Sequence, residues 1–330
     1  MEITTAQEQD IPLIVALLKK SLGESLLPKS VNYWRWKHID NPFGASPVLL
    51  AWEGNQLIGV RAFMRWRWQH GARQAEAVRA VDTATHPDHQ GKGIFKKLTL
   101  ALVDQGKAQG WNFVFNTPNN NSMPGYLKMG WKDAGKLPIH VQALRPVSMV
   151  LNAALKRKAA DHGLQGTPVA EILQHAGVPV LLQQTIQQQA AAAWVTPHTR
   201  ESLLWRYQAV PVVKYAACSL TQGNDLQAVA FYRLKPSRAG VEFRVADLFT
   251  APGASRQAVA RMLRDQARAE QADYLTASGC QNQYTGAGLL RLRNLKIGPI
   301  VTTRTLATDM TEDLTGFRSW SPSLGDLELF

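Results

Sequence analysis

The chain has 330 residues, of which 45% are hydrophobic and 19% are charged, with a formal net charge of +12 at pH 7. This length favours two domains, since one domain usually has about 100 to 150 residues, and the composition excludes a disordered chain. The sequence has only two cysteines, which excludes a disulfide framework and a clustered metal site, so we expect no metal. No apolar run reaches the roughly 18 residues of a spanning helix, so we expect a cytoplasmic protein. The charge suits a phosphate-bearing ligand, an anionic acceptor, nucleic acid or a membrane surface and does not decide among them.

The first half of the chain predicts a run of strands followed by a helix. A Trp-Arg-Trp-Lys run at 34–37 precedes strands over 48–52 and 57–63, and a further strand over 78–85 ends just before His-Pro. Apolar residues at helical spacing after residue 93 predict an amphipathic helix. Another strand follows this helix, from Trp111 to Phe115.

Hydrophobic and basic side chains alternate over residues 63–68, Phe-Met-Arg-Trp-Arg-Trp. Alternation puts Met64, Trp66 and Trp68 on one face of a strand and Arg65 and Arg67 on the other. We interpret this run as a half-buried strand with solvated arginines, the alternative being that these arginines line an acceptor cleft.

The second half repeats these landmarks in the same order. Residues 204–207 precede strands over 215–218 and 226–231, and residues 243–252 predict a strand that ends at a proline. A helical pattern and a strand over 273–277 complete the copy. We interpret the repeat as an internal duplication, the alternative being chance similarity between two ordinary successions of strands and helices.

The strongest chemical signal lies between a predicted strand and a predicted helix. Residues 87–95 read Pro-Asp-His-Gln-Gly-Lys-Gly-Ile-Phe. Glycines at such a turn let successive backbone N–H groups converge, and the positive end of the helix dipole adds to them, so the loop can hold a pyrophosphate. The spacing fits neither a P-loop nor the G-x-G-x-x-G of a dinucleotide fold.

Gln90, Gly91 and Gly93 resemble motif A of the GNAT (N-acetyltransferase) superfamily, Q/R-x-x-G-x-G/A, which grips the pyrophosphate of coenzyme A. Phe95 departs from the Gly or Ala of the sixth position, although its backbone N–H is retained. The turn at 253–257 lacks the pattern, so the resemblance implies no such site in the second unit. It implies that acetyl-CoA or coenzyme A, as co-substrate, contacts Thr83, Thr85, Gln90, Gly91, Lys92, Gly93, Ile94 and Phe95.

A second point of resemblance is Asn119 together with Tyr-Leu-Lys-Met-Gly-Trp at 126–131, where Trp131 replaces the usual Phe. In GNAT enzymes this Asn contacts the pantetheine arm and this Tyr protonates the departing thiolate, which implies these roles for Asn119 and Tyr126. A phenol can donate that proton without first becoming charged. The alternative for Tyr126 is a core tyrosine whose hydroxyl is satisfied by the backbone.

Transfer to an amine also needs a proton acceptor, because an ammonium has no lone pair with which to attack. Asp82 is the catalytic candidate, provided that burial or a bridging water assists a carboxyl whose ordinary pKa is about 3.9. Asp247 occupies the matching position of the unit that lacks the loop, which favours strand-end hydrogen bonding as the alternative role. His86 and His89 are further candidates, with His89 expected as an exposed turn residue.

These observations predict an α+β protein of two GNAT-like units, each a mixed, mostly antiparallel twisted sheet flanked by helices. Residues 1–146 would be the acyl-CoA-binding catalytic domain, and residues 147–330 a helical connector and a degenerate second domain. The expected function is acyl-CoA-dependent transfer of an acetyl group to the amine of a small-molecule or metabolite acceptor, for which an anionic compound suits the charge. The apolar tail over 320–330 would dock on the body or reach the acceptor site.

Two other functions stay open at this point. One is a non-catalytic acyl-CoA-binding or regulatory module, with nucleic acid as a less expected partner. The other is an aminoacyl-tRNA-dependent transferase of a related tandem fold, against which the retained Gln90 to Gly93 argue.

Overall fold

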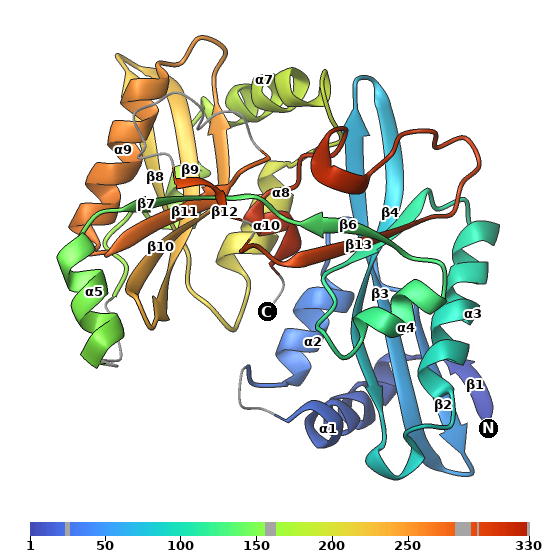
Figure 1. Ribbon diagram of the computed structural model, residues 1–330. Coiled ribbons are helices and arrows are strands. Elements are labelled where there is room, and N and C mark those ends of the chain that lie inside the picture. The colour runs from blue at the N-terminus through green and yellow to red at the C-terminus, as the bar shows by residue number, and fades with distance from the viewer. Residues whose placement is uncertain (24–26, 156–162, 281–291, 296, 329–330) are drawn as a thin grey trace.

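The computed structural model describes residues 1–23, 27–155, 163–280, 292–295 and 297–328. Two mixed sheets, mostly antiparallel, stand beside each other with helices against their faces (Figure 1). This confirms the predicted α+β class with two sheets. No helix in these described ranges has the length and apolar content needed to cross a bilayer.

The first sheet has seven strands in the order β1-β2-β3-β4-β5-β13-β6. Helices α1 (Ile11–Leu22) and α2 (Val31–His38) pack on one face, and α3 (Ile94–Ala108) and α4 (Met123–Lys128) pack on the other. The strands are β1 (Glu2–Thr5), β2 (Val48–Glu53), β3 (Gln56–His70), β4 (Arg73–Thr85), β5 (Phe113–Asn116), β6 (Lys132–Lys136) and β13 (Ile300–Thr305).

The second sheet has six strands in the order β12-β7-β11-β10-β9-β8. Helix α9 (Arg256–Ala269) packs on one of its faces through an apolar stripe. The strands are β7 (Ile139–Ala143), β8 (Ala216–Gln222), β9 (Asp225–Ser237), β10 (Gly240–Thr250), β11 (Tyr274–Ser278) and β12 (Leu292–Leu295). The remaining helices are α5 (Pro146–Leu155), α6 (Val169–Ile172), α7 (Val178–Ala190), α8 (Arg200–Leu203) with the π-helical turn η3 (Leu204–Gln208), and α10 (Leu324–Leu327), besides 3-10 turns such as η2 (Pro87–His89).

Each half of the chain lends one strand to the sheet of the other half. The green strand β7 lies beside the orange strand β11 in the second sheet, and the red strand β13 lies beside β6 in the first (Figure 1). The two inserted strands pair at corresponding positions. Phe113 of β5 pairs with Thr305 of β13, and Tyr274 of β11, which has the same place in its sheet, pairs with Ala143 of β7. The boundary after residue 146 stays a prediction, and both sheets are built across it.

Two tryptophans make a reciprocal contact between the units. The rings of Trp36 and Trp205 stack with centroids 5.0 Å apart, and each indole N–H donates to the backbone oxygen of the other residue at 2.7 Å. A contact that is the same from both sides is what a two-fold relation between similar units produces. It therefore aligns Trp36 with Trp205 in the internal repeat.

The two units also share one hydrophobic core. Trp66, Trp68 and Phe113 of the first sheet and Phe231 of the second belong to the same buried cluster, together with Trp320 from the C-terminal segment. Met64, Trp66 and Trp68 are buried, which confirms the predicted alternation along β3. The tail therefore docks on the body of the protein, at least as far as Trp320.

A chain that ends at residue 146 should fail to fold. It lacks β13, which leaves β5 and β6 without their shared partner, and it lacks the side chains that cover Trp66 and Trp68. Unpaired strand edges and exposed aromatic surface both disfavour an independent domain. We expect the full chain, but not this fragment, to unfold cooperatively when heating is followed by circular dichroism, and a cooperative transition in the fragment would contradict the shared core.

Candidate active site

The glycine-rich loop joins η2 to α3 and leaves the start of the helix uncapped. Gly91 and Gly93 both have φ of +76°, a left-handed conformation that side chains other than glycine's rarely adopt, and open space surrounds each of them. The N-cap residue of α3 is Gly93, which has no side chain with which to cap the first-turn N–H groups of the helix. Those N–H groups remain available to an anion at the positive end of the helix dipole.

The parallel strands β4 and β5 separate beside this loop. In the described ranges, they pair only from Ala77 to Arg79 against Phe113 to Phe115. Beyond it, Thr83 and Thr85 pair with β3 on one side only. The other edge of this part of β4 therefore offers backbone groups to a ligand in the gap between the strands.

A cleft of about 580 Å³ opens at this separation of β4 and β5. Of the predicted site residues, Asp82, Thr83, Asn119 and Tyr126 line it, whereas Thr85 and the loop over 90–95 lie outside its lining. The other walls come from β3, α2, β4 and the C-terminal segment, through Arg61, Lys37, Arg79, Leu327 and Glu328 respectively, the last two both belonging to the C-terminal segment. Both halves of the chain thus contribute to one cleft.

Tyr126 lies on α4 with its hydroxyl held by a buried arginine. Arg61 on β3 is fully buried and donates a hydrogen bond from Nη2 to the Tyr126 hydroxyl at 2.7 Å. A guanidinium donates and does not accept, so this bond occupies a lone pair of the phenol oxygen and leaves the phenol proton free to be donated elsewhere. This differs from a core tyrosine whose hydroxyl donates to the backbone.

Phe95 packs against Tyr126, and Asn119 orders the turn that leads into its helix. The Phe95 ring meets the Tyr126 ring edge-on, with centroids 5.5 Å apart. The Asn119 Oδ1 accepts from the backbone N–H groups of Asn121 and Ser122, just before α4 begins. The aromatic residue at the sixth loop position therefore packs against the tyrosine.

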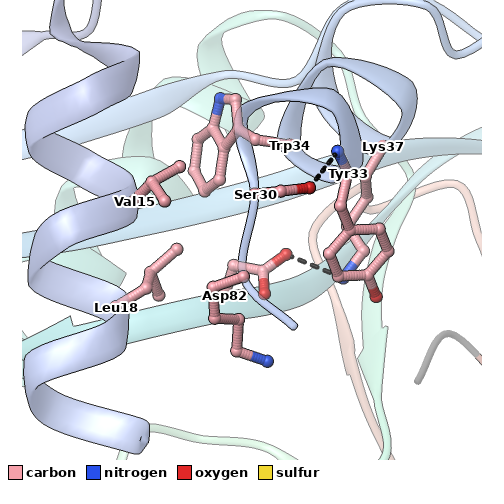
Figure 2. A pocket seen from close by; sticks show the side chains of 8 residues that line it. Val15, Leu18, Ser30, Tyr33, Trp34, Lys37 and Asp82 are labelled. Atoms are coloured by element: carbon pink, nitrogen blue, oxygen red, sulfur yellow. Dashed lines mark hydrogen bonds and ion pairs between the residues drawn. The ribbon is translucent and has the colours of Figure 1, made fainter. Parts of the chain in front are cut away.

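Asp82 is held by two donors from α2. It is the extra residue of a bulge between β3 and β4, with φ of +37°, and this bend directs its carboxylate towards the helix. Lys37 Nζ and His38 Nε2 both donate to Asp82 Oδ2 at 2.9 Å. Figure 2 shows the Lys37 contact beside the small hollow between α1 and α2.

These contacts make Asp82 a weak base. Burial alone would raise the pKa of Asp82, but the Lys37 ammonium and the His38 hydrogen bond hold it well below its usual range. Burial lowers the pKa of His38, so its imidazole is neutral, with the proton on Nε2 and with Nδ1 accepting from Ser46. Asp82 is therefore an ionised anchor for α2 in this geometry, and its predicted role as proton acceptor lacks the raised pKa that it requires.

The second unit contains the same anchor. The Trp36–Trp205 alignment places His38 opposite Tyr207, and the Tyr207 hydroxyl donates to Asp247 just as His38 donates to Asp82. This carboxylate occurs in both units, although only the first has the glycine-rich loop. The comparison favours the structural alternative for Asp82 over the catalytic one.

The other two candidates for the proton acceptor lie outside the cleft lining. His86 Nε2 lies 2.8 Å from Lys20 Nζ and 3.2 Å from Gln56 Nε2. His89 is 7% exposed, which corrects the expectation of an exposed turn residue, and its ring packs edge-on against that of His86. This histidine pair fills the base of the loop.

Sequence reasoning missed the residues that fix the cleft walls. The sequence does mark Arg61 as unusual, because it is the single charged residue inside the apolar run 57–63. Arg79 and Arg206 had no such signal, since most of their hydrogen-bond partners are backbone oxygens at the far end of the chain. Arg79 donates to the carbonyls of Asp326 and Leu327, and Arg206 donates to those of Gly325 and Glu328.

No group of His, Cys, Asp and Glu side chains suited to a metal ion occurs in the part of the chain that the structure describes. Two mixed sheets, a parallel pair that splays and an uncapped glycine-rich loop together define a protein of GNAT-like fold with two units. Residues 2–134 match the family model of the acetyltransferase (GNAT) domain. The first unit of the chain is therefore similar to a GNAT domain over residues 2–134.

Known proteins agree with this assignment. The L-amino acid N-acyltransferase MnaT of Escherichia coli strain K12 is 28% identical over 95 residues. These residues are 28% of this chain and 54% of that protein, so the chain spans about half of that relative's length. A GCN5-related N-acetyltransferase from Anabaena variabilis has a TM-score of 0.59 at 14% identity, over 93% of this chain and 73% of that one. A conserved protein from Enterococcus faecalis has a TM-score of 0.64 at 9% identity, over 92% and 72% of the two chains. At these identities the structural likeness concerns the fold alone.

Replacing Asp82 by Asn should destabilise the protein, because it leaves the Lys37 ammonium buried without its counter-ion. We expect a loss of about 3 to 5 kcal/mol at pH 7, measured by urea unfolding. Asp40→Asn, an exposed carboxyl two residues beyond His38, is the matched control and should change stability by less than about 0.5 kcal/mol.

The pH dependence of the free energy of unfolding should also differ between Asp82→Asn and the parent. The folded pKa of Asp82 is below its unfolded value of about 3.9, so its contribution is present above that pH and is lost as pH falls. The stability of Asp82→Asn should therefore decline less steeply below about pH 4 than that of the parent. Equal acid slopes would show that Asp82 is not ion-paired in solution.

Proposed function

We propose that the protein is an acyl-CoA-dependent N-acyltransferase that moves an acetyl group from acetyl-CoA directly to the amine of a small-molecule acceptor. The observation that carries this proposal is the Arg61–Tyr126 pair at the cleft. A binding module has no use for a phenol whose proton is kept free, whereas a departing thiolate requires such a donor. The GNAT domain match over residues 2–134 supports the same reaction class.

The coenzyme would lie along the first unit from the loop to the cleft. Its pyrophosphate would accept hydrogen bonds from the N–H groups over 91–95, where α3 begins. Its pantetheine arm would run between β4 and β5, with Thr83 and Asn119 beside it. The thioester would then reach Tyr126 in the cleft.

Chemistry in the cleft would proceed through one addition and one elimination. The acceptor nitrogen attacks the thioester carbonyl carbon and forms the new C–N bond. The C–S bond then breaks, and the coenzyme A sulfur takes the phenol proton of Tyr126 as it leaves. The acceptor nitrogen releases its own proton to water in the cleft, and Tyr126 is reprotonated from solvent. Arg61, directly bonded to the phenol oxygen, offsets negative charge on that oxygen during the step.

The acceptor is proposed to be a small amine, with L-amino acids as the first compounds to test. The name of the Escherichia coli relative refers to that class of acceptor. Transfer is tested by incubating the chain with acetyl-CoA and a panel of amines, and by following both free coenzyme A and the acetylated product by mass spectrometry. Production of free coenzyme A without any acetylated amine would contradict the proposal.

Gly93→Ala should weaken coenzyme A binding by tenfold or more. A side chain there opposes the positive φ and enters the space that the phosphates require. Gly110→Ala is the matched control, because Gly110 follows the other end of α3 with φ of +75° and equally open surroundings. Calorimetric titration should show normal affinity for the control, and equal affinities for both variants would remove the loop from the site.

Tyr126→Phe should keep acetyl-CoA affinity and lower turnover by about 10²-fold to 10⁴-fold, the usual contribution of a general acid. Only the hydroxyl is lost, while the ring contacts with Phe95 and Trp131 remain. Steady-state rates with a saturating acceptor measure the effect. Unchanged turnover would return Tyr126 to a packing role and would favour the binding-module alternative.

A further inference from the structure

Equivalent positions of the two sheets carry opposite kinds of side chain. In the first sheet, the pairing of β3, β4 and β5 forms two rows across the face that meets the second unit. Apart from Arg79, these positions are apolar and belong to the shared core. The rows are Trp66, Ala77 and Phe113, and Met64, Arg79 and Phe115.

In the second sheet, the same two rows are polar. The pairing of β9, β10 and β11 has the same register, with Glu242 to Arg244 in the place of Ala77 to Arg79. The rows are Lys235, Glu242 and Tyr274, and Arg233, Arg244 and Thr276. Where the first copy packs aromatic rings, the second copy has a cavity of about 540 Å³.

This second cavity has an apolar wall and a charged floor. Ile139 and Val141 of β7, Met149 of α5, and Leu324 and Leu327 of α10 supply apolar lining. The volume lies within the range of about 300 to 1,000 Å³ that small-molecule sites occupy. An apolar wall with a few polar groups gathered on one side is the usual composition of such sites.

On the charged side of the cavity, the two arginines are paired with carboxylates, and Lys235 is the cation that a ligand could contact. Glu328 pairs with Arg233 and Arg244 at 2.5 Å, and Glu242 pairs with Arg244 at 2.7 Å. Lys235, also in the lining, makes no direct hydrogen bond and no ion pair within 4 Å with the residues that the structure describes, and Glu328 and Glu242 act on it only at longer range. Burial, with Arg244 nearby, lowers the pKa of Lys235, so an anion beside this ammonium would stabilise its charged form.

We propose that this cavity is a second ligand site, which takes an amphiphilic monoanion with its apolar body against β7 and α10 and its carboxylate on Lys235. The site is separate from the active cleft, since Lys235 lines only the second cavity. The two share a wall, because Leu327 and Glu328 line both of them. Binding here does not depend on acyl transfer.

The test is calorimetric titration of the full chain with decanoate, a carboxylate on an unbranched apolar chain. We expect one decanoate per chain. Lys235→Met keeps the apolar stem and removes the charge, and it should weaken binding by about 10-fold to 100-fold, as for the loss of one hydrogen bond to a charged group. Thr276→Phe restores the aromatic residue that the first sheet has at this position, Phe115, and should abolish binding by filling the cavity.

Two controls keep the result interpretable. Lys214→Met removes an exposed lysine of the second unit outside the cavity and should bind decanoate as the parent does. Decyltrimethylammonium has the same apolar chain with a cationic head and should not bind. If Thr276→Phe fails to fold, the decanoate affinity of Lys235→Met alone tests the proposal. Parent-like affinity in Lys235→Met, equal binding of the cationic amphiphile, or no binding of decanoate by the parent would each overturn the proposal.

Discussion

Each sheet of this molecule is completed by a strand from the other half of the chain, and the reciprocal stacking of Trp36 and Trp205 ties the two halves at the point where they meet. The strand β13 separates β5 from β6, so the sheet that carries the glycine-rich loop depends on residues near the C-terminus. The cleft therefore also depends on both halves of the chain. Its tyrosine and splayed strand come from the first half, and its opposite wall is Leu327 and Glu328.

The C-terminal segment has its place because two buried arginines donate to its backbone oxygens. Arg79 comes from β4 and Arg206 from η3, so the end of α10 is held by both units at once. Helix ends leave carbonyl groups without partners, and cationic donors are well suited to them. Held in this way, the segment lies between the cleft and the second cavity and lines both of them.

Local sequence patterns were enough to predict β2 to β5, β8 to β11, the helices α3 and α9 and the loop, because the responsible interactions lie within a few residues of each other. Gly91 and Gly93 bear the positive φ that their position at the start of α3 suggested. The role of Asp82 could not be predicted in this way, since it depends on Lys37 and His38 some 44 residues earlier in the chain. The strand exchange was hidden for the same reason: β13 pairs with residues about 190 positions away, and no local pattern encodes that.

The two units place different side chains on a similar framework of strands. Both retain the anchored carboxylate, at Asp82 and Asp247, and only the first retains the glycine-rich loop. The most direct test of this account is to count coenzyme A molecules bound to the intact chain by native mass spectrometry at saturating ligand. The account predicts one per chain. Two per chain would contradict it, because the second unit would then hold the coenzyme without the loop to which binding is assigned.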